Sequence, residues 1–181
     1  MRLTQLLNAE KDKTSIERAR QIATDTYLLP AEKIKELLFA AYQRRPAGAQ
    51  ADPVLAEAME VLRAWNNRMD VDQSGATLIA LLIKTRQPSF DFFAPGVVEA
   101  AGAQEGDRLL EWMAQVARNV KERFGSVQAP YGKVHRYRYG GKELPLPGLD
   151  SYTLRAGGAR LDKDLTMEVL GGSSFSMVVD L

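Results

Sequence analysis

Apolar residues recur every three or four positions through the first two thirds of the chain. This spacing places them on one face of a helix and predicts a helix wherever it is sustained. Pro30 interrupts the first such stretch, and either kinks the helix or opens a new one at Ala31. Residues 89–106 keep no steady spacing and are expected to form a loop or a broken helix. The expected helices cover residues 16–23, 31–41, 53–65, 74–83 and 107–124.

Residues that begin or end helices stand at several of these boundaries. Thr14 and Glu17 have the spacing of a capping box, in which a hydroxyl and a carboxylate each accept a backbone N–H of the first turn. Asp52-Pro53 is a strong start signal, because it combines an acceptor side chain with a proline suited to the first turn. We expect Asp107 to cap the last long helix and Gly125 to end it.

Beyond Gly125 the pattern changes from helical spacing to short alternating runs typical of strands. Gly140-Gly141 reads as a turn, and the prolines of residues 144–148 keep that segment extended. A glycine-rich turn is expected at 171–174. The expected strands cover residues 133–139, 166–169 and 175–179.

The order of the elements, with helices first and strands afterwards, predicts an α+β fold. We expect a helical region, residues 1–125, and a β-rich segment, residues 126–181, to form one domain or a fragment of one. The last expected strand runs apolar into Leu181 without a polar tail. Because the ends of natural domains are usually exposed, we expect that the chain was cut here from a longer protein.

Composition narrows the possible functions. Lys and Arg total 24 against 23 for Asp and Glu, so the chain lacks the basic excess typical of nucleic-acid or anionic-membrane binding. It contains no cysteine, which excludes thiolate chemistry, disulfides and cysteine-based metal sites. The N-terminal residues turn polar before an apolar stretch of signal-peptide length develops, and no apolar run is long enough to span a membrane.

The segment 70–75 begins like a calcium-binding EF-hand loop, with Asp70, Asp72 and Ser74 at alternate positions and Gly75 at the sixth. The twelfth position, which needs a bidentate glutamate, is occupied by Leu81. An apolar helical pattern also starts at Ser74. Asp72 and Ser74 are therefore better explained as helix caps, and no metal ligand is assigned.

His135 is the only histidine and so the only side chain whose unperturbed pKa lies near neutrality. It could in principle serve Ser173 or Ser174 as a base, but neither serine lies in a Gly-x-Ser-x-Gly elbow. Between cationic neighbours, His135 is expected on a solvated, cationic strand face. Gly171-Gly172 could form an anion-binding nest of N–H groups, although a hairpin turn is the commoner explanation.

A short patch of cations and aromatics would suit single-stranded nucleic acid. It extends over one strand only, so a solvated sheet face is the preferred interpretation. Its members are Lys133, Arg136, Tyr137, Arg138 and Tyr139. Trp65 and Trp112 stand at apolar helical positions and are expected in the core. From the residues alone we assign no catalytic, cofactor-binding or metal-binding residue.

Three stretches together resemble the penicillin acylase (penicillin amidase) family of N-terminal nucleophile hydrolases. The first, residues 56–78, is similar to a helix ending in tryptophan, followed by an acidic-serine-glycine link. The second, residues 131–148, resembles a Trp-Gly-x-Val-x-Arg segment continuing into Leu-Pro-Leu-x-Gly, with Tyr131 in place of the usual tryptophan. The third, residues 171–181, is similar to the strand that follows a glycine-rich turn. Residues 16–41 resemble the branch that includes aculeacin and acyl-homoserine lactone acylases.

The resemblance implies an αββα fold and a reaction. In that family an N-terminal serine, freed by self-cleavage, attacks an amide while its own α-amine acts as the base. Backbone N–H groups and an asparagine hold the oxyanion. The substrates are N-acyl amides such as penicillins or acyl-homoserine lactones, no cofactor is needed, and members are commonly periplasmic or secreted.

No catalytic residue of that family can be carried over to this chain. The chain begins Met1-Arg2 rather than with serine, and no serine lies in a matching self-cleavage context. Asn66, Asn67 and Asn119 do not match the surroundings of the oxyanion asparagine. We therefore expect an internal or C-terminal-region scaffold fragment of the large subunit that is inactive in isolation.

Two functions stay open at the level of sequence. The first is a scaffold fragment of an amide hydrolase, partnered by the remainder of the acylase or by self-association through exposed strand edges. The second is a stand-alone, non-catalytic binding or interaction module derived from the same family. Neither is expected to bind nucleic acid or a membrane.

Overall fold

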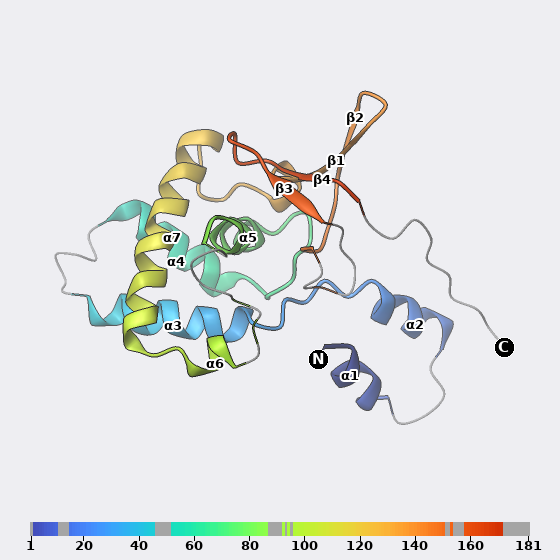
Figure 1. Cartoon of the computed structure of the whole chain (residues 1–181), viewed down its shortest axis with the longest axis horizontal. Coiled ribbons are helices and arrows are strands. Elements are labelled where there is room, and N and C mark those ends of the chain that lie inside the picture. The colour runs from blue at the N-terminus through green and yellow to red at the C-terminus, as the bar shows by residue number, and fades with distance from the viewer. Residues whose placement is uncertain are drawn as a thin grey trace.

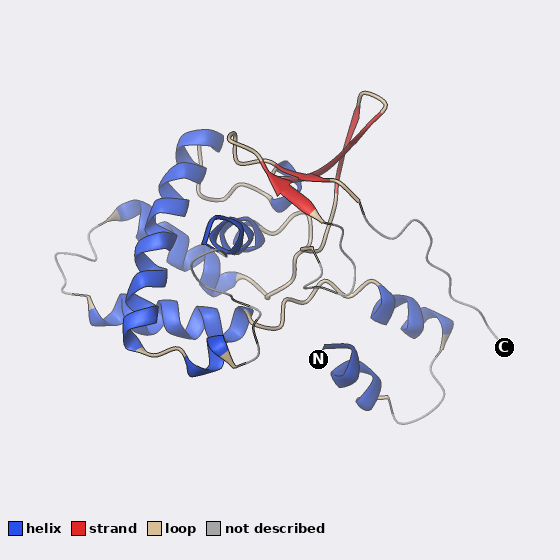
Figure 2. Ribbon diagram, in the orientation of Figure 1, coloured by secondary structure: helices blue, strands red, loops and turns tan. Residues whose placement is uncertain are grey.

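The structure is a computed structural model that describes residues 2–10, 15–45, 52–86, 92, 94, 96–150, 153 and 158–171. It is a mixed α+β fold, with the helices preceding the strands along the chain, as the sequence pattern predicts (Figure 2). Whether residues 1–125 and 126–181 act as one domain stays a prediction. The helices are α1 Arg2–Asn8, α2 Ile16–Ala23, α3 Ala31–Arg44, α4 Pro53–Ala64, α5 Ser74–Arg86, α6 Val97–Ala100 and α7 Ala103–Phe124.

Helix α5 lies at the centre of the fold. In Figure 1 it is seen end-on, with α3, α4 and α7 around it and the strands on a further side. Every residue from position 75 to position 83 is buried. A helix that is apolar all round is stable only when its whole surface is buried, here by the surrounding helices and strands, and each fully buried Leu or Ile contributes about 1.5–3 kcal/mol. Burial of α5 is therefore the main apolar contribution to this part of the core.

The amphipathic helices turn their apolar faces toward α5 and one another. In α3 the predicted stripe is confirmed, since Ile34, Leu37, Leu38 and Ala41 are all buried. In α4 the core face is formed by Leu55, Ala58, Met59 and Leu62, whereas Val54 and Val61 are only partly buried.

Several helix boundaries confirm the sequence signals. Helix α3 begins at Ala31, directly after Pro30. Asp52 caps α4 through N–H groups of Val54 and Leu55, at 3.0 and 3.2 Å from its Oδ1. Gly125 ends α7 with a left-handed φ of 79°, a conformation that glycine adopts without steric cost.

The predicted caps of α2 and α7 are wrong. Helix α2 is capped by Ser15, whose Oγ accepts the N–H of Arg18 at 3.1 Å; Thr14 lies outside the described residues. Helix α7 begins at Ala103 rather than at Asp107, because the Glu105 carboxylate accepts the N–H of Gly102 at 3.0 Å and stabilises an earlier first turn.

The strands form one mixed sheet in the order β2-β1-β4-β3. Strands β1 and β2 form an antiparallel hairpin with positive-φ Gly140 and Gly141 in its turn, as predicted. Strand β4 runs parallel to β1 and antiparallel to β3. The hairpin extends away from the helices in Figure 1. The strands are β1 His135–Tyr139, β2 Lys142–Pro145, β3 Ala159–Leu161 and β4 Met167–Val169.

Three details of the strand pattern differ from expectation. The strand predicted from residue 133 begins at His135, because a 3₁₀ turn, η2 Tyr131–Lys133, precedes it. Pro145 belongs to β2, which lies at the sheet edge, where a residue without an N–H is tolerated. Strand β3 was not predicted. The expected strand 175–179, together with Gly172, Ser173 and Ser174, lies outside the described residues.

Candidate functional site

Two segments of the second motif stretch meet the link between α4 and α5 at one place, which we call the motif junction. It comprises residues 69–71, 131–136 and 144–148. Backbone hydrogen bonds join them: Gly132 N donates to Val71 O at 2.7 Å, Gly148 N to Met69 O at 2.8 Å, and Leu146 N to His135 O at 3.1 Å. The Tyr131 hydroxyl donates to Gly148 O at 2.8 Å. Segments 60 or more residues apart in sequence are thus fastened together.

Glycines allow the close approaches around this junction. A Cβ on Gly132 would lie 2.8 Å from Pro145 Cβ and 3.2 Å from Val71 Cβ. A Cβ on Gly75 would lie 2.4 Å from both Cβ and Cγ of Trp65. Real Cβ atoms do not approach other atoms so closely. Gly75 and Gly132 are therefore explained here by packing rather than by ligand binding.

The prediction that His135 lies on a solvated cationic strand face is wrong. It is 1% exposed, and its ring stacks on Tyr131 with centroids 5.0 Å apart. Nδ1 lies 2.8 Å from Leu146 O, so this nitrogen carries the proton of the neutral ring. Strand alternation turns His135 toward the core and Arg136 and Arg138 to the opposite face.

Burial perturbs both rings of this stack. Loss of hydration lowers the pKa of His135, an effect that the hydrogen bond to Leu146 and the charge of Asp150 partly offset. Burial, reinforced by Asp150, raises the pKa of Tyr131 well above its usual value. Both rings therefore remain uncharged around neutral pH.

An ion pair lies beside the junction and organises the start of β3. Lys84 of α5 pairs with Asp150, and each side chain is 14% exposed. Lys84 Nζ donates to Ala159 O at 2.9 Å, while Asp150 Oδ1 accepts Ala159 N at 2.8 Å. Together the two side chains satisfy both backbone groups of Ala159, as a neighbouring strand would do. Asp150 adopts a φ of 41°, uncommon for a residue other than glycine.

The polar side chains of the EF-hand-like segment make hydrogen bonds within the protein. The Asp70 carboxylate accepts from the Thr26 hydroxyl and from Arg68 Nε, and Asp72 accepts from the Gln73 side chain at 3.3 Å. Helix α5 begins at Ser74 as predicted, but the Ser74 hydroxyl donates to Gln128 O at 2.9 Å instead of capping the helix. Within the described ranges no group of three His, Asp or Glu side chains is arranged to hold a metal ion.

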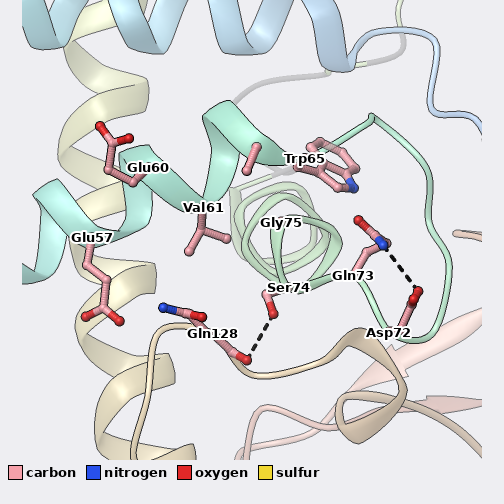
Figure 3. A pocket seen from close by; sticks show the side chains of 10 residues that line it. Glu57, Glu60, Val61, Trp65, Asp72, Gln73, Ser74, Gly75 and Gln128 are labelled. Carbon is pink, nitrogen blue, oxygen red and sulfur yellow. Dashed lines mark hydrogen bonds between the residues drawn. The ribbon is translucent and has the colours of Figure 1, made fainter.

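A groove of about 410 Å³ lies beside the junction, between α4, the start of α5 and the loop that carries Gln128 (Figure 3). Two carboxylates of the groove are partly neutralised by cations. Glu57 Oε2 lies 3.7 Å from Lys121 Nζ, and Glu60 pairs with Arg63. Its size falls within the range of small-molecule sites. The lining residues are Glu57, Glu60, Val61, Ala64, Trp65, Asp72, Gln73, Ser74, Gly75 and Gln128.

The remaining candidates have structural roles. Arg136 and Arg138 both bond Glu143 on β2, which lowers the pKa of that carboxyl. Asn67 adopts a φ of 64° and accepts Lys35 Nζ at 3.0 Å, and Asn119 accepts the Gln115 side chain. Trp65 is buried as predicted, whereas Trp112 is only partly buried, beneath Arg86. Exposed Lys133 lies in η2.

The described serines contact backbone groups rather than a base. Ser15 and Ser126 accept backbone N–H groups, and Ser74 donates to a carbonyl. In this part of the chain none of them is hydrogen-bonded to His135 or to a lysine, as an activated nucleophile requires. No helix among the described residues is long and apolar enough to cross a membrane.

The family model for penicillin amidase matches residues 1–181, the whole of the chain. The chain belongs to the penicillin amidase family. No curated protein sequence matches it. The predicted resemblance is therefore confirmed at the level of the family, and the chain is an acylase-like hydrolase scaffold. In this penicillin amidase-family chain, two of the predicted stretches contribute to the motif junction.

The sequence patterns did not indicate the Lys84–Asp150 pair. These residues are 66 positions apart, and nothing in their neighbourhoods links them. One signal was available: Lys84 is the first cation after the apolar run of α5, and a partly buried lysine needs an anionic partner.

Proposed function

We propose that this chain is non-catalytic scaffold of an amide hydrolase that cleaves N-acyl amides such as penicillins or acyl-homoserine lactones. Within the family we assign it to the branch similar to aculeacin and acyl-homoserine lactone acylases, with an N-terminal nucleophile hydrolase fold. The observation that carries the proposal is the motif junction. Its segments are used for backbone pairing and close packing rather than for lining an open cleft.

The chemistry of amide cleavage supports this division of labour. The reaction needs a nucleophile held against a base, and N–H donors aimed at the developing oxyanion. At the junction, the N–H groups of Gly132, Leu146 and Gly148 already donate to carbonyl oxygens. His135 is stacked and buried, so its ring lies out of reach of a substrate.

The test is an amidase assay with the purified chain, using a chromogenic phenylacetyl amide and an N-acyl-homoserine lactone. We expect no turnover above buffer, and the same result for His135→Asn and Ser74→Ala. Turnover by the chain that either substitution, or Ser174→Ala, abolished would refute the scaffold proposal. A second arm adds a separately produced, serine-led large-subunit segment of a penicillin amidase. Activity that appears only in the mixture would support it directly.

We propose that the partner of this scaffold is the remainder of an acylase polypeptide, which pairs with β2. Strand β2 lies at the edge of the sheet formed by the described strands, all its residues are exposed, and Leu144 is 54% exposed. Unpaired strand edges favour addition of another strand. Light scattering should show a complex with the serine-led segment that Leu144→Lys weakens. A dimer of the chain that persisted when this segment was added would instead identify a second copy as the partner.

A further inference from the structure

His135 contributes both its side chain and its backbone to the motif junction. Its ring is 1% exposed and stacks nearly parallel on Tyr131, with 13° between the planes. Nδ1 donates to Leu146 O, directly after β2, while the backbone oxygen of His135 accepts Leu146 N. One residue thus fastens β1 to the segment that follows β2 through both its side chain and its backbone.

The second ring nitrogen has no partner. His135 Nε2 is fully buried and accepts no hydrogen bond within the part of the chain that the structure describes. A lone pair without a donor costs little, but protonation would create a buried N–H and a positive charge with no acceptor. A buried, unsatisfied charged donor costs several kcal/mol in comparable settings.

The charges around the ring do not remove this penalty. From α5, Lys84 disfavours a second positive charge, whereas Asp150 favours one. Asp150 is already paired with Lys84 and with Ala159 N. From η2 the facing group is the uncharged Tyr131, and from β4 the residue paired with His135 is Met167.

Most other charged groups of the sheet lie on its opposite face, whereas Lys142 shares the face of His135 but pairs with Tyr139 beside the hairpin turn. Arg136, Arg138 and Glu143 pair with one another across β1 and β2, and Glu168 of β4 pairs with Arg160. Because side chains alternate along a strand, these groups point away from the His135 ring.

We propose that His135 makes the motif junction a pH-sensitive switch, which is closed while the ring is neutral and opens when Nε2 takes up a proton. Opening would break the pairing of His135 with Leu146 and loosen the contact between Val134 O and Met167 N, 2.6 Å apart in the closed form. The β1–β2 hairpin would then be freed from the helices while α5 kept its own core. This inference does not depend on whether the chain is catalytic.

The direction of the pH dependence follows from linkage. Burial lowers the pKa of folded His135 below the ordinary 6.5. The contribution of the closed junction is therefore complete above pH 6.5, and is lost as the pH falls from 6.5 through the folded pKa. Each unit between the two pKa values makes opening about tenfold more favourable at low pH.

The experiment is NMR of the intact chain, in which the single histidine gives one imidazole signal. We expect this signal to titrate below pH 6.5. Amide exchange of Leu146 and Met167, corrected for its intrinsic pH dependence, should accelerate as the pH falls from 7 to 5, by about tenfold for each unit by which the measured imidazole pKa lies below 6.5, while amides of α5 keep their protection. A titration at or above pH 6.5, or equal acceleration in α5 and the junction, would overturn the proposal.

His135→Asn is the matched variant, because asparagine places a donor near the position of Nδ1 and does not titrate. Its junction amides should exchange at rates that no longer respond to pH between 7 and 5. Acceleration equal to that of the wild type would assign the effect to other groups and overturn the switch. If the variant does not fold, the imidazole titration and the site-resolved exchange of the wild type still decide the question.

Discussion

The substitution Gly75→Ala has two effects of opposite sign on the stability of the fold. Gly75 is the second residue of α5, and alanine is favoured over glycine in a helix by up to about 1 kcal/mol. Local preference alone therefore predicts a more stable protein. The added Cβ, however, would lie 2.4 Å from both Cβ and Cγ of Trp65, about 1 Å inside ordinary contact distance.

Trp65 cannot move aside easily, because the clash involves the root of its side chain rather than a flexible end. Its indole Nε1 donates to Arg68 O at 2.7 Å, and its carbonyl accepts Lys35 Nζ at 2.8 Å. Overpacking of this kind costs about 1–3 kcal/mol and sometimes more. We expect a steric cost at the upper end of this range. Once the helix preference for alanine is subtracted, the free energy of unfolding should fall by about 2 kcal/mol.

The assay is thermal unfolding of Gly75→Ala beside the wild type. A loss of about 2 kcal/mol lowers the melting temperature by roughly 4–8 °C for a chain of this size, and a displaced Trp65 would shift the tryptophan emission to longer wavelength. Gly158→Ala is the control, since a Cβ there meets nothing within 4 Å; its stability should change little. If Gly75→Ala were as stable as the wild type, the steric reasoning would be refuted.

Three further substitutions test other contacts by the same unfolding assay. Lys84→Met leaves Asp150 partly buried without its cation and should lower the free energy of unfolding by about 2–4 kcal/mol. If replacing both residues together cost as much as the sum of the two single replacements, the two side chains would not be coupled. Thr77→Val removes a fully buried hydroxyl that donates to a backbone carbonyl at 2.7 Å and should cost about 1–2 kcal/mol. Thr85→Val, on the exposed end of the same helix, is the control and should change stability by less than about 0.5 kcal/mol. Equal losses in the two variants would show that the buried Thr77 hydrogen bond makes no special contribution. Asp52→Ala removes the cap of α4 and should cost about 1 kcal/mol; an unchanged unfolding midpoint would show that the cap contributes nothing.

Local signals predicted helices α2 to α5 and most of α7 because their causes are local, whereas α1 was not predicted. Asp52-Pro53 and Gly125 act on their own turns, and the structure places α4 and the end of α7 where they indicate. The start of α7 was misplaced at Asp107, because Glu105 reaches back to Gly102 and adds a turn that apolar spacing does not mark. Boundaries depend on such single contacts, whereas the body of a helix depends on many residues.

The candidate site could not be predicted in the same way, because its contacts join distant segments. His135 was assigned to a solvent-facing strand from its cationic neighbours, yet strand alternation turns it away from them and into the core. Its neighbours are Leu146, Tyr131 and Asp150. They are brought together only where β1, the loop after β2 and α5 meet in the folded chain. The prolines and glycines of these motifs marked the place of the crossing, but not which side chains it would bury.

The burial of α5 on all sides has a consequence for dividing this protein into pieces. A helix without a polar face cannot be left uncovered by removing a neighbour, since a bare apolar surface of that size promotes aggregation. Any shortened version that omits α7, or the stretch of η2 that contacts α5, would expose it. Soluble expression should therefore require residues 52–134 together, and the smallest independently folding unit extends past the point where helices give way to strands.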